Sequence, residues 1–151
     1  MVNTMFCLLT FSETVAFTVM TLISGRSSSQ PKFETVVTNE GNAFSIANGI
    51  FTAPRKGLYY FIFHLVKSRS SDRVDMCHCT LYKNGASTGL NAHIDPEDPS
   101  GSGGADKGSY GVSNSGYLIL ELGDTVSLEN CSQPNTFNAQ SSFSGYLVTP
   151  M

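Results

Sequence analysis

Hydrophobic and polar residues alternate along most of the chain in short runs, and turn-forming residues separate each run from the next. A period of two residues is typical of β-strands, and the chain contains no convincing stretch of helical periodicity. The Asn-Gly pairs at 48–49 and 84–85 and the reversals at 54–57 and 122–124 supply turns. The pattern predicts ten strands, over residues 14–23, 33–38, 43–46, 49–52, 57–66, 74–83, 86–92, 115–121, 124–130 and 141–148.

The number of strands predicts the fold class. Ten short strands favour an all-β sandwich of two sheets, because one flat sheet of that size would leave a face without a core. We assign the globular domain to residues 14–151. Residues 1–13 contain a short apolar stretch but neither a basic start nor a small-residue cleavage site. They are therefore either the remnant of a leader or the start of the first strand.

Two segments, 24–32 and 95–116, are rich in Ser, Gly and Pro and are predicted to be surface loops. The second is unusually long for a compact domain, and it carries four acidic residues beside Tyr110. One hypothesis is that it binds a ligand or calcium. The other is a flexible loop without a ligand, and no calcium or other metal ligand is assigned.

The strand over residues 57–64 is apolar on both faces, because Tyr59, Phe61 and Phe63 alternate with a second apolar row. Only one face of a sandwich strand meets the core, so a loop or another subunit must cover the other, and we predict that the chain forms an oligomer. The strands at 141–148 and 14–23 repeat the pattern. The predicted subunit interface comprises Phe17, Leu58, Tyr60, Ile62, His64, Phe143 and Tyr146.

Composition adds to this picture. The chain has 151 residues and a mass of 16.2 kDa, with 40% hydrophobic and only 14% charged residues, which suits one compact domain. A net charge of −3 gives no general attraction to nucleic acid. No apolar run is long enough to span a membrane.

The four cysteines are Cys7, Cys77, Cys79 and Cys131. Cys77 and Cys79 share one face of a predicted strand with Leu81, which favours burial. A zinc site would need a second pair of ligands at the usual spacing, and the sequence has none. We therefore expect either buried thiols or one disulfide to Cys131.

A search for catalytic residues gives no candidate. The three histidines, His64, His78 and His93, lie on separate predicted strands or strand ends, without a nucleophile elbow or a phosphate loop. The Gly-rich stretch at 101–104 lacks the Lys-Ser/Thr ending of a phosphate-binding loop. The chain is therefore predicted not to be an enzyme and to require no cofactor.

An ordered set of motifs resembles the globular C1q-domain family of the tumour necrosis factor superfamily. The set runs over Val15-Ala16-Phe17, Asn39-Glu40-Gly41, Gly49-Ile50-Phe51-Thr52-Ala53-Pro54, Gly57-Leu58-Tyr59-Tyr60-Phe61, Lys83-Asn84-Gly85, Ser115-Gly116-Tyr117-Leu118, Leu122-Gly123-Asp124-Thr125-Val126 and Phe143-Ser144-Gly145-Tyr146-Leu147. This resemblance implies a ten-stranded jelly roll that forms a homotrimer, with strands 57–64 and 141–148 near the three-fold axis. Without a collagen repeat or coiled-coil heptads, the chain is similar to head-only members of that family.

The resemblance also implies a role outside the cell. The leading hypothesis is a secreted, lectin-like pattern-recognition protein of innate immunity that binds carbohydrates on microbial surfaces. The alternative is a trimeric extracellular signalling ligand for a cell-surface receptor. Sugar recognition needs hydrogen-bonding groups and an aromatic face, and the candidates are Asn91, His93, Asp95, Ser109 and Tyr110. The competing interpretation is that these residues are solvated loop tips.

Overall fold

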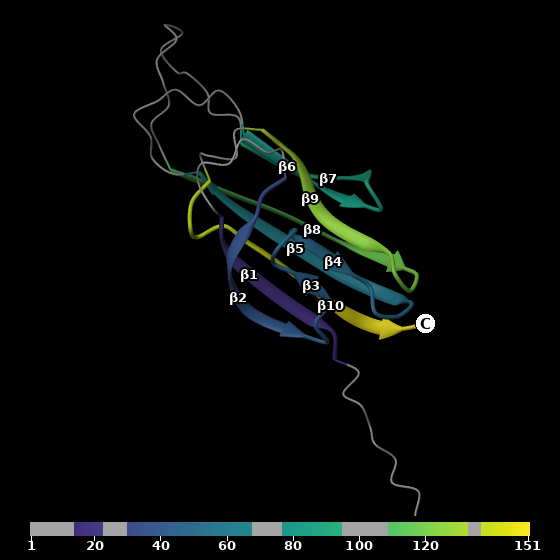
Figure 1. Cartoon of the computed structure of the whole chain (residues 1–151). Coiled ribbons are helices and arrows are strands. Elements are labelled where there is room, and N and C mark those ends of the chain that lie inside the picture. Colours follow the sequence, from purple (N-terminus) through teal and green to yellow (C-terminus); the bar gives the residue numbers. More distant parts are fainter. Residues whose placement is uncertain (1–13, 23–29, 68–76, 95–108, 133–136) are drawn as a thin grey trace, which may run out of the picture.

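The computed structural model describes residues 14–22, 30–67, 77–94, 109–132 and 137–151. It confirms the all-β class and the ten predicted strands (Figure 1). The strands are β1 (Ala16–Leu22), β2 (Phe33–Glu40), β3 (Phe44–Ser45), β4 (Ile50–Thr52), β5 (Gly57–Lys67), β6 (Cys77–Lys83), β7 (Ala86–Ile94), β8 (Tyr110–Leu120), β9 (Thr125–Ser132) and β10 (Ser142–Pro150).

The strands form two antiparallel five-stranded sheets with jelly-roll connections (Figure 1). Sheet A has the order β2-β1-β10-β5-β8, and sheet B has the order β3-β4-β9-β6-β7. The first and last of these strands, β1 and β10, are neighbours in sheet A. The turn between β6 and β7 is the predicted Asn84-Gly85 pair, and both residues have positive φ, 51° and 74°, as a tight hairpin turn requires.

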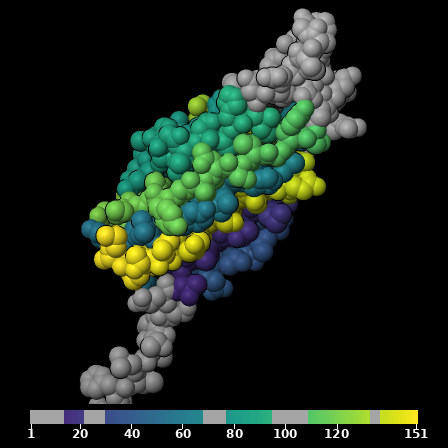
Figure 2. All heavy atoms as spheres, turned by 180° about the vertical axis from the view of Figure 1, so that it is seen from behind, coloured from purple at the N-terminus to yellow at the C-terminus, as the bar shows by residue number. Residues whose placement is uncertain are grey.

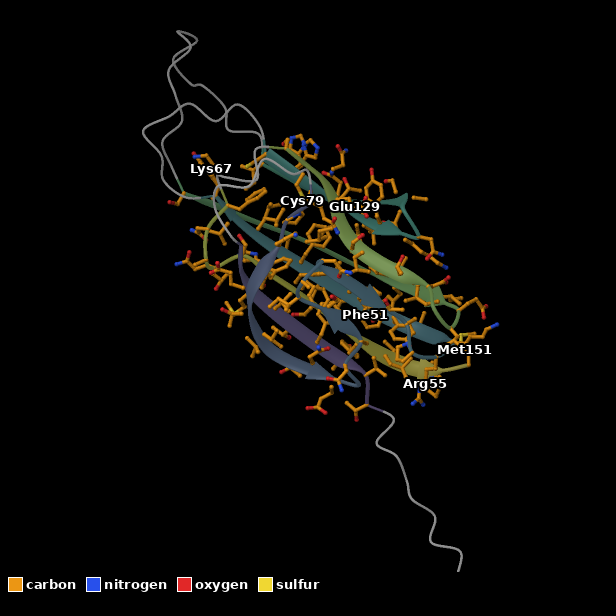
Figure 3. All side chains as sticks on the ribbon, viewed as in Figure 1. Phe51, Arg55, Lys67, Cys79, Glu129 and Met151 are labelled. Carbon is orange, nitrogen blue, oxygen red and sulfur yellow. A yellow bond between two sulfur atoms is a disulfide. The ribbon has the colours of Figure 1, made fainter. Side chains whose placement is uncertain are left out.

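The core lies between the sheets and is rich in aromatic side chains (Figure 3, where Phe51 is labelled). On β5, Tyr59, Phe61 and Phe63 are fully buried, and Phe51 of sheet B lies 5.4 Å from Phe61 between ring centroids. Gly145 of β10 makes room for these rings, since a Cβ there would lie 2.5 Å from Phe61. The predicted alternation along β5 is therefore confirmed.

Two residues of the predicted subunit interface belong to this core instead. Phe17 and Phe143 are only 2% and 0% exposed, and their ring centroids lie 5.0 Å apart. Phe143 is in register with Phe63, whose side chain points inward. The prediction that Phe17 and Phe143 face a partner subunit is wrong, because their strands place them on the inward row.

The cysteines confirm one of the two alternatives. Cys79 of β6 and Cys131 of β9 form a disulfide within sheet B, and Cys77 is a buried cysteine outside that disulfide. As predicted, Cys77, Cys79 and Leu81 share the inward face of β6.

The predicted loop at 95–116 is wrong at its C-terminal end. Residues 110–116 belong to β8, where Tyr110 pairs with Lys67 and Gly116 pairs with Phe61. Pairing with β5 satisfies the backbone of this Ser- and Gly-rich stretch, which therefore needs no strong strand propensity of its own. The residues 95–108, most of the loop predicted at 24–32, and residues 1–13 lie outside the described part of the chain.

Candidate functional site

The outer face of sheet A carries three tyrosines from three neighbouring strands. Tyr60 of β5 is in register with Tyr117 of β8 and with Tyr146 of β10. The ring centroids lie 4.9 Å apart for Tyr60 and Tyr117 and 5.7 Å apart for Tyr60 and Tyr146. Tyr117 is 61% exposed and Tyr146 is 47% exposed. We call these three residues the tyrosine cluster.

Aliphatic side chains extend the tyrosine cluster into an apolar surface. Ile62, Ile119 and Val148 are exposed on sheet A, and Leu58 lies half-buried beside them. A hollow of about 460 Å³ opens next to Tyr146, between the start of β1 and the end of β10. Figure 2 shows strands of sheet A as bands of colour with none of the described elements lying over them. Continuous exposed apolar surface of this kind marks an interaction site.

His64 lies on the same outer face, further along β5. It is half-buried, and its Nδ1 lies 2.7 Å from Ser113 Oγ of β8. Leu58, Tyr60, Ile62, His64 and Tyr146 therefore all face outward on sheet A, which is the direction that the predicted interface requires.

The outer face of sheet B is polar by contrast. Asn91 of β7 donates a hydrogen bond to Thr80 Oγ1 of β6 over 2.8 Å, and Ser127 donates one to Glu129 Oε1 of β9 over 2.6 Å. Figure 3 shows Glu129 near Cys79, whose own side chain points into the core. These polar side chains thus form hydrogen bonds with one another within the chain.

The predicted ligand-binding residues are on strands or beside them. Asn91 and His93 lie on β7, facing outward from sheet B. Ser109 is exposed and directly precedes Tyr110, the first residue of β8, whereas Asp95 lies outside the described residues. Tyr110 belongs to sheet A, so the structure divides the predicted set between two sheets.

These two groups nevertheless lie at one end of the sandwich. The backbone carbonyl of Asn91 accepts a hydrogen bond from Asn114 Nδ2 of β8 over 2.8 Å, so the edges of the two sheets meet there. At the opposite end, Lys83 Nζ donates to the carbonyl of Ile119 over 2.9 Å. The C-terminal end of β7 and the N-terminal end of β8 therefore lie close to each other.

A buried cation at this end was not among the candidates from the sequence. Lys67 is fully buried at the end of β5, and its ammonium lies 5.7 Å from the centroid of the Tyr110 ring (Figure 3). The alternation in the sequence could have indicated that Lys67 is buried, because Lys67 continues the inward row of Phe63 and Leu65. A cation over a tyrosine face is a favourable contact.

The other end of the sandwich is held by a carboxylate in a turn. Asp124 accepts hydrogen bonds from Asn84 Nδ2 and from the backbone N–H of Glu121, both over 2.9 Å, and its Oδ2 lies 3.0 Å from Lys83 Nζ. These donors, Asn84 first, lower the pKa of Asp124 to about 2. The network stabilises the turns after β6 and β8 together.

Over the described ranges, no three His, Cys, Asp or Glu side chains gather closely enough to form a metal site of three ligands. Within the same residues, the structure contains no helix with the length and apolarity needed to cross a membrane.

Comparison with known proteins identifies the family. The family model described as the C1q domain matches residues 16–148. The globular domain of zebrafish complement 1qA protein has a similar structure, with a TM-score of 0.69 and 21% sequence identity. That match covers 91% of this chain and 99% of the zebrafish chain. The jelly-roll prediction and the resemblance are both confirmed, and the chain belongs to the C1q domain family.

Proposed function

We propose that this protein is a homotrimeric, secreted recognition protein whose outer face of sheet A forms the contact between subunits. C1q domains are recognition or signalling modules that are generally trimeric and extracellular. The observation that carries the proposal is the tyrosine cluster, with Tyr117 61% exposed among aliphatic neighbours in the single chain. Burying this surface in an assembly removes apolar area from water.

The ligands that we propose are carbohydrates on microbial surfaces, in a lectin-like role in innate immunity. The support is chemical: Asn91, His93, Ser109 and Tyr110 offer amide, imidazole, hydroxyl and phenol groups at one end of the sandwich. Such groups hydrogen-bond sugar hydroxyls, and a phenol ring can stack on a sugar ring. Asp95 follows directly after β7 and completes the proposed set. The proposal includes no catalytic activity and no required cofactor.

Assembly would make weak sites useful. Three heads that engage one surface bind with a high effective concentration, so each site needs only modest affinity. The same arrangement explains why no deep sugar pocket is required at any one chain. Binding to a multivalent surface should therefore be far stronger than binding to a free sugar.

A glycan array tests the ligand class, followed by agglutination of bacteria in the presence of simple sugars. We expect binding by the wild type, and at least tenfold weaker binding by His93→Ala and by Tyr110→Ala. Thr52→Ala, exposed on the outer face of sheet B, is the matched control and should bind as the wild type does. If both site variants keep full binding, the assigned residues are wrong. A trimer that binds no glycan but binds saturably to a cell-surface receptor would support the signalling alternative instead.

A further inference from the structure

The outer face of sheet B places two histidines from neighbouring strands beside each other, although a regular hairpin would not pair them. His78 of β6 is directly opposite His93 of β7 in the antiparallel register. Their inward neighbours Cys77 and Ile94 are buried, so both imidazoles belong to the solvent side of the sheet. His93 is exposed, and His78 is half-buried. Residues directly opposite each other on such a pair have Cβ atoms about 5 Å apart.

This pairing depends on an irregularity in the hairpin. Near the turn, Lys83 pairs with Ala86 and Tyr82 pairs with Ser87, and a regular continuation would set His78 opposite Asn91. The register shifts between Thr80 and Tyr82. The shift moves β7 along by two residues, so the side chains keep their faces and an imidazole takes the place of an amide.

A serine on β9, the neighbour of β6 on its other side, contacts one of the two imidazole rings. Ser132 of β9 is in register with His78, and its Oγ lies 3.0 Å from His78 Nδ1. The same oxygen accepts a hydrogen bond from the His78 backbone N–H over 3.1 Å. In the tautomer with hydrogen on Nδ1, the ring donates to Ser132, and Nε2 carries the lone pair that a metal ion would bind. When a histidine binds a metal ion through one ring nitrogen, its other ring nitrogen usually donates a hydrogen bond to an oxygen atom.

We propose that His78 and His93 together bind one divalent transition-metal ion on the outer face of sheet B. Imidazole nitrogen suits Ni²⁺, Cu²⁺ and Zn²⁺ rather than Ca²⁺. Two side chains that chelate one ion are enough for binding, and water or an incoming oxygen or nitrogen donor completes the coordination. Ser132 is a positioning residue, and Glu129 adds a negative charge on the same face of β9.

The chain contains its own control for this site. His64 is also half-buried on a strand with its Nδ1 near a serine Oγ, over 2.7 Å to Ser113. Its directly opposite neighbours are Ser113 and Ser142, not a second histidine. An effect that requires a pair of imidazoles should therefore be absent at His64.

Calorimetric titration of the tag-free, full-length protein with Ni²⁺ alone tests the proposal. We expect one Ni²⁺ per chain in the wild type and a rise in the melting temperature with Ni²⁺. His78→Gln and His93→Gln should each weaken binding at least tenfold, and His64→Gln should leave the affinity unchanged. Since His93 is exposed, its variant should fold even if the half-buried His78 does not tolerate replacement.

Three results would overturn the proposal: no saturable binding to the wild type, full binding by His93→Gln, or equal loss in His64→Gln. The role of Ser132 has a separate test. Ser132→Ala should weaken Ni²⁺ binding by about tenfold or more, and Ser132→Thr should restore it because the hydroxyl is retained. A loss of affinity that threonine does not rescue would show that Ser132 acts only through the stability of β9. None of these readouts depends on carbohydrate binding.

Discussion

The two sheets enclose one core but present opposite outer faces. On sheet A, Tyr60, Tyr117 and Tyr146 lie against one another, and the exposed neighbours are aliphatic. On sheet B, Asn91 bonds to Thr80 across the strands. A face that remains in water can be stable with polar groups that bond to water and to one another. A continuous apolar face gains free energy when a partner covers it and removes it from water.

The sheets also differ in what stabilises them beyond the shared core. A disulfide between Cys79 and Cys131 joins two strands of sheet B covalently. In sheet A the described strands carry no disulfide, and the tyrosine cluster provides surface for further burial. We infer that sheet A is adapted to assembly and sheet B to contact with solvent, ligands or ions.

The largest effect is expected where a charge enters the tyrosine cluster. In Tyr117→Asp the side chain stays solvated in the single chain, since Tyr117 is 61% exposed there. In the assembly the carboxylate would be buried without a partner, which costs about 3–5 kcal/mol. Analytical ultracentrifugation at micromolar concentration should show three times the chain mass of 16.2 kDa for the wild type and the single-chain mass for the variant.

The matched control for that experiment is Thr52→Asp, which places the same charge at an exposed site on the outer face of sheet B. It should keep the mass of the wild type. If the wild type itself sediments as a single chain, sheet A is not an assembly face. If both aspartate variants dissociate, the two outer faces do not differ in the way we describe.

The next largest effect concerns the covalent link of sheet B. Replacing both partners in Cys79→Ala/Cys131→Ala should lower the free energy of unfolding by about 2–4 kcal/mol, because the disulfide closes a loop with a sequence separation of 52 residues. Urea unfolding monitored by circular dichroism measures this loss. Cys77→Ala removes a buried sulfur from the same face of the same strand and should cost less. Equal losses would mean that packing, and not the disulfide, stabilises sheet B.

The strand pattern and the inward row of β5 could be predicted because alternation is a local property of the sequence. The errors came from non-local pairing. Aromatic residues occur both in cores and at interfaces, so the residue type of Phe17 and Phe143 does not tell which way they point. The sheet shows it, because Phe143 is in register with the inward Phe63 of β5 and Phe17 is in register with Gly145 on the same row of β10. Likewise, the stretch from Tyr110 to Gly116 has a composition typical of loops and becomes a strand because β5 supplies its hydrogen bonds.

The candidate sites were less predictable than the fold for a related reason. The pairing of His78 with His93 requires the register shift in the β6–β7 hairpin, and Gly89 takes a φ of +81° in the same hairpin. A regular hairpin built from the Asn84-Gly85 turn would separate the two rings by two positions. Side-chain chemistry can be found in a sequence, whereas the shift that brings two side chains together depends on the whole sheet.

A smaller effect is expected within the polar face of sheet B. Asn91→Ala removes the donor to Thr80 Oγ1, and Thr80 is only 5% exposed. A buried hydroxyl without this partner should cost about 1–2 kcal/mol of stability, measured by urea unfolding. The sedimenting mass should not change, because the side chain lies away from sheet A. A change in mass would show that the polar face also takes part in assembly.

The smallest effect is expected at Asp124, in the turn where β8 of sheet A leads into β9 of sheet B. Its pKa is lowered from 3.8 to about 2 by the hydrogen bonds from Asn84 and from the Glu121 N–H and by Lys83. Because the folded pKa lies below the unfolded value, the carboxylate stabilises the fold above about pH 4, and this contribution is lost as the pH falls through 2. Asp124→Asn should therefore be less stable than the wild type at pH 7, and the difference should shrink on acidification.

Urea midpoints at pH 7, 4 and 2 measure this contribution for both proteins. Glu121→Gln is the matched control, since it removes an exposed carboxylate from the same turn that pairs with Lys56 over 2.9 Å. The Glu121 side chain accepts none of the hydrogen bonds that Asp124 accepts. Asp124→Asn should therefore weaken the connection between the turns after β6 and β8, and Glu121→Gln should not. A constant difference between Asp124→Asn and the wild type at all three pH values would contradict the assignment. The turn would then connect the sheets through its backbone alone, as the 2.8 Å bond from the Ala53 N–H to the Asp124 carbonyl does.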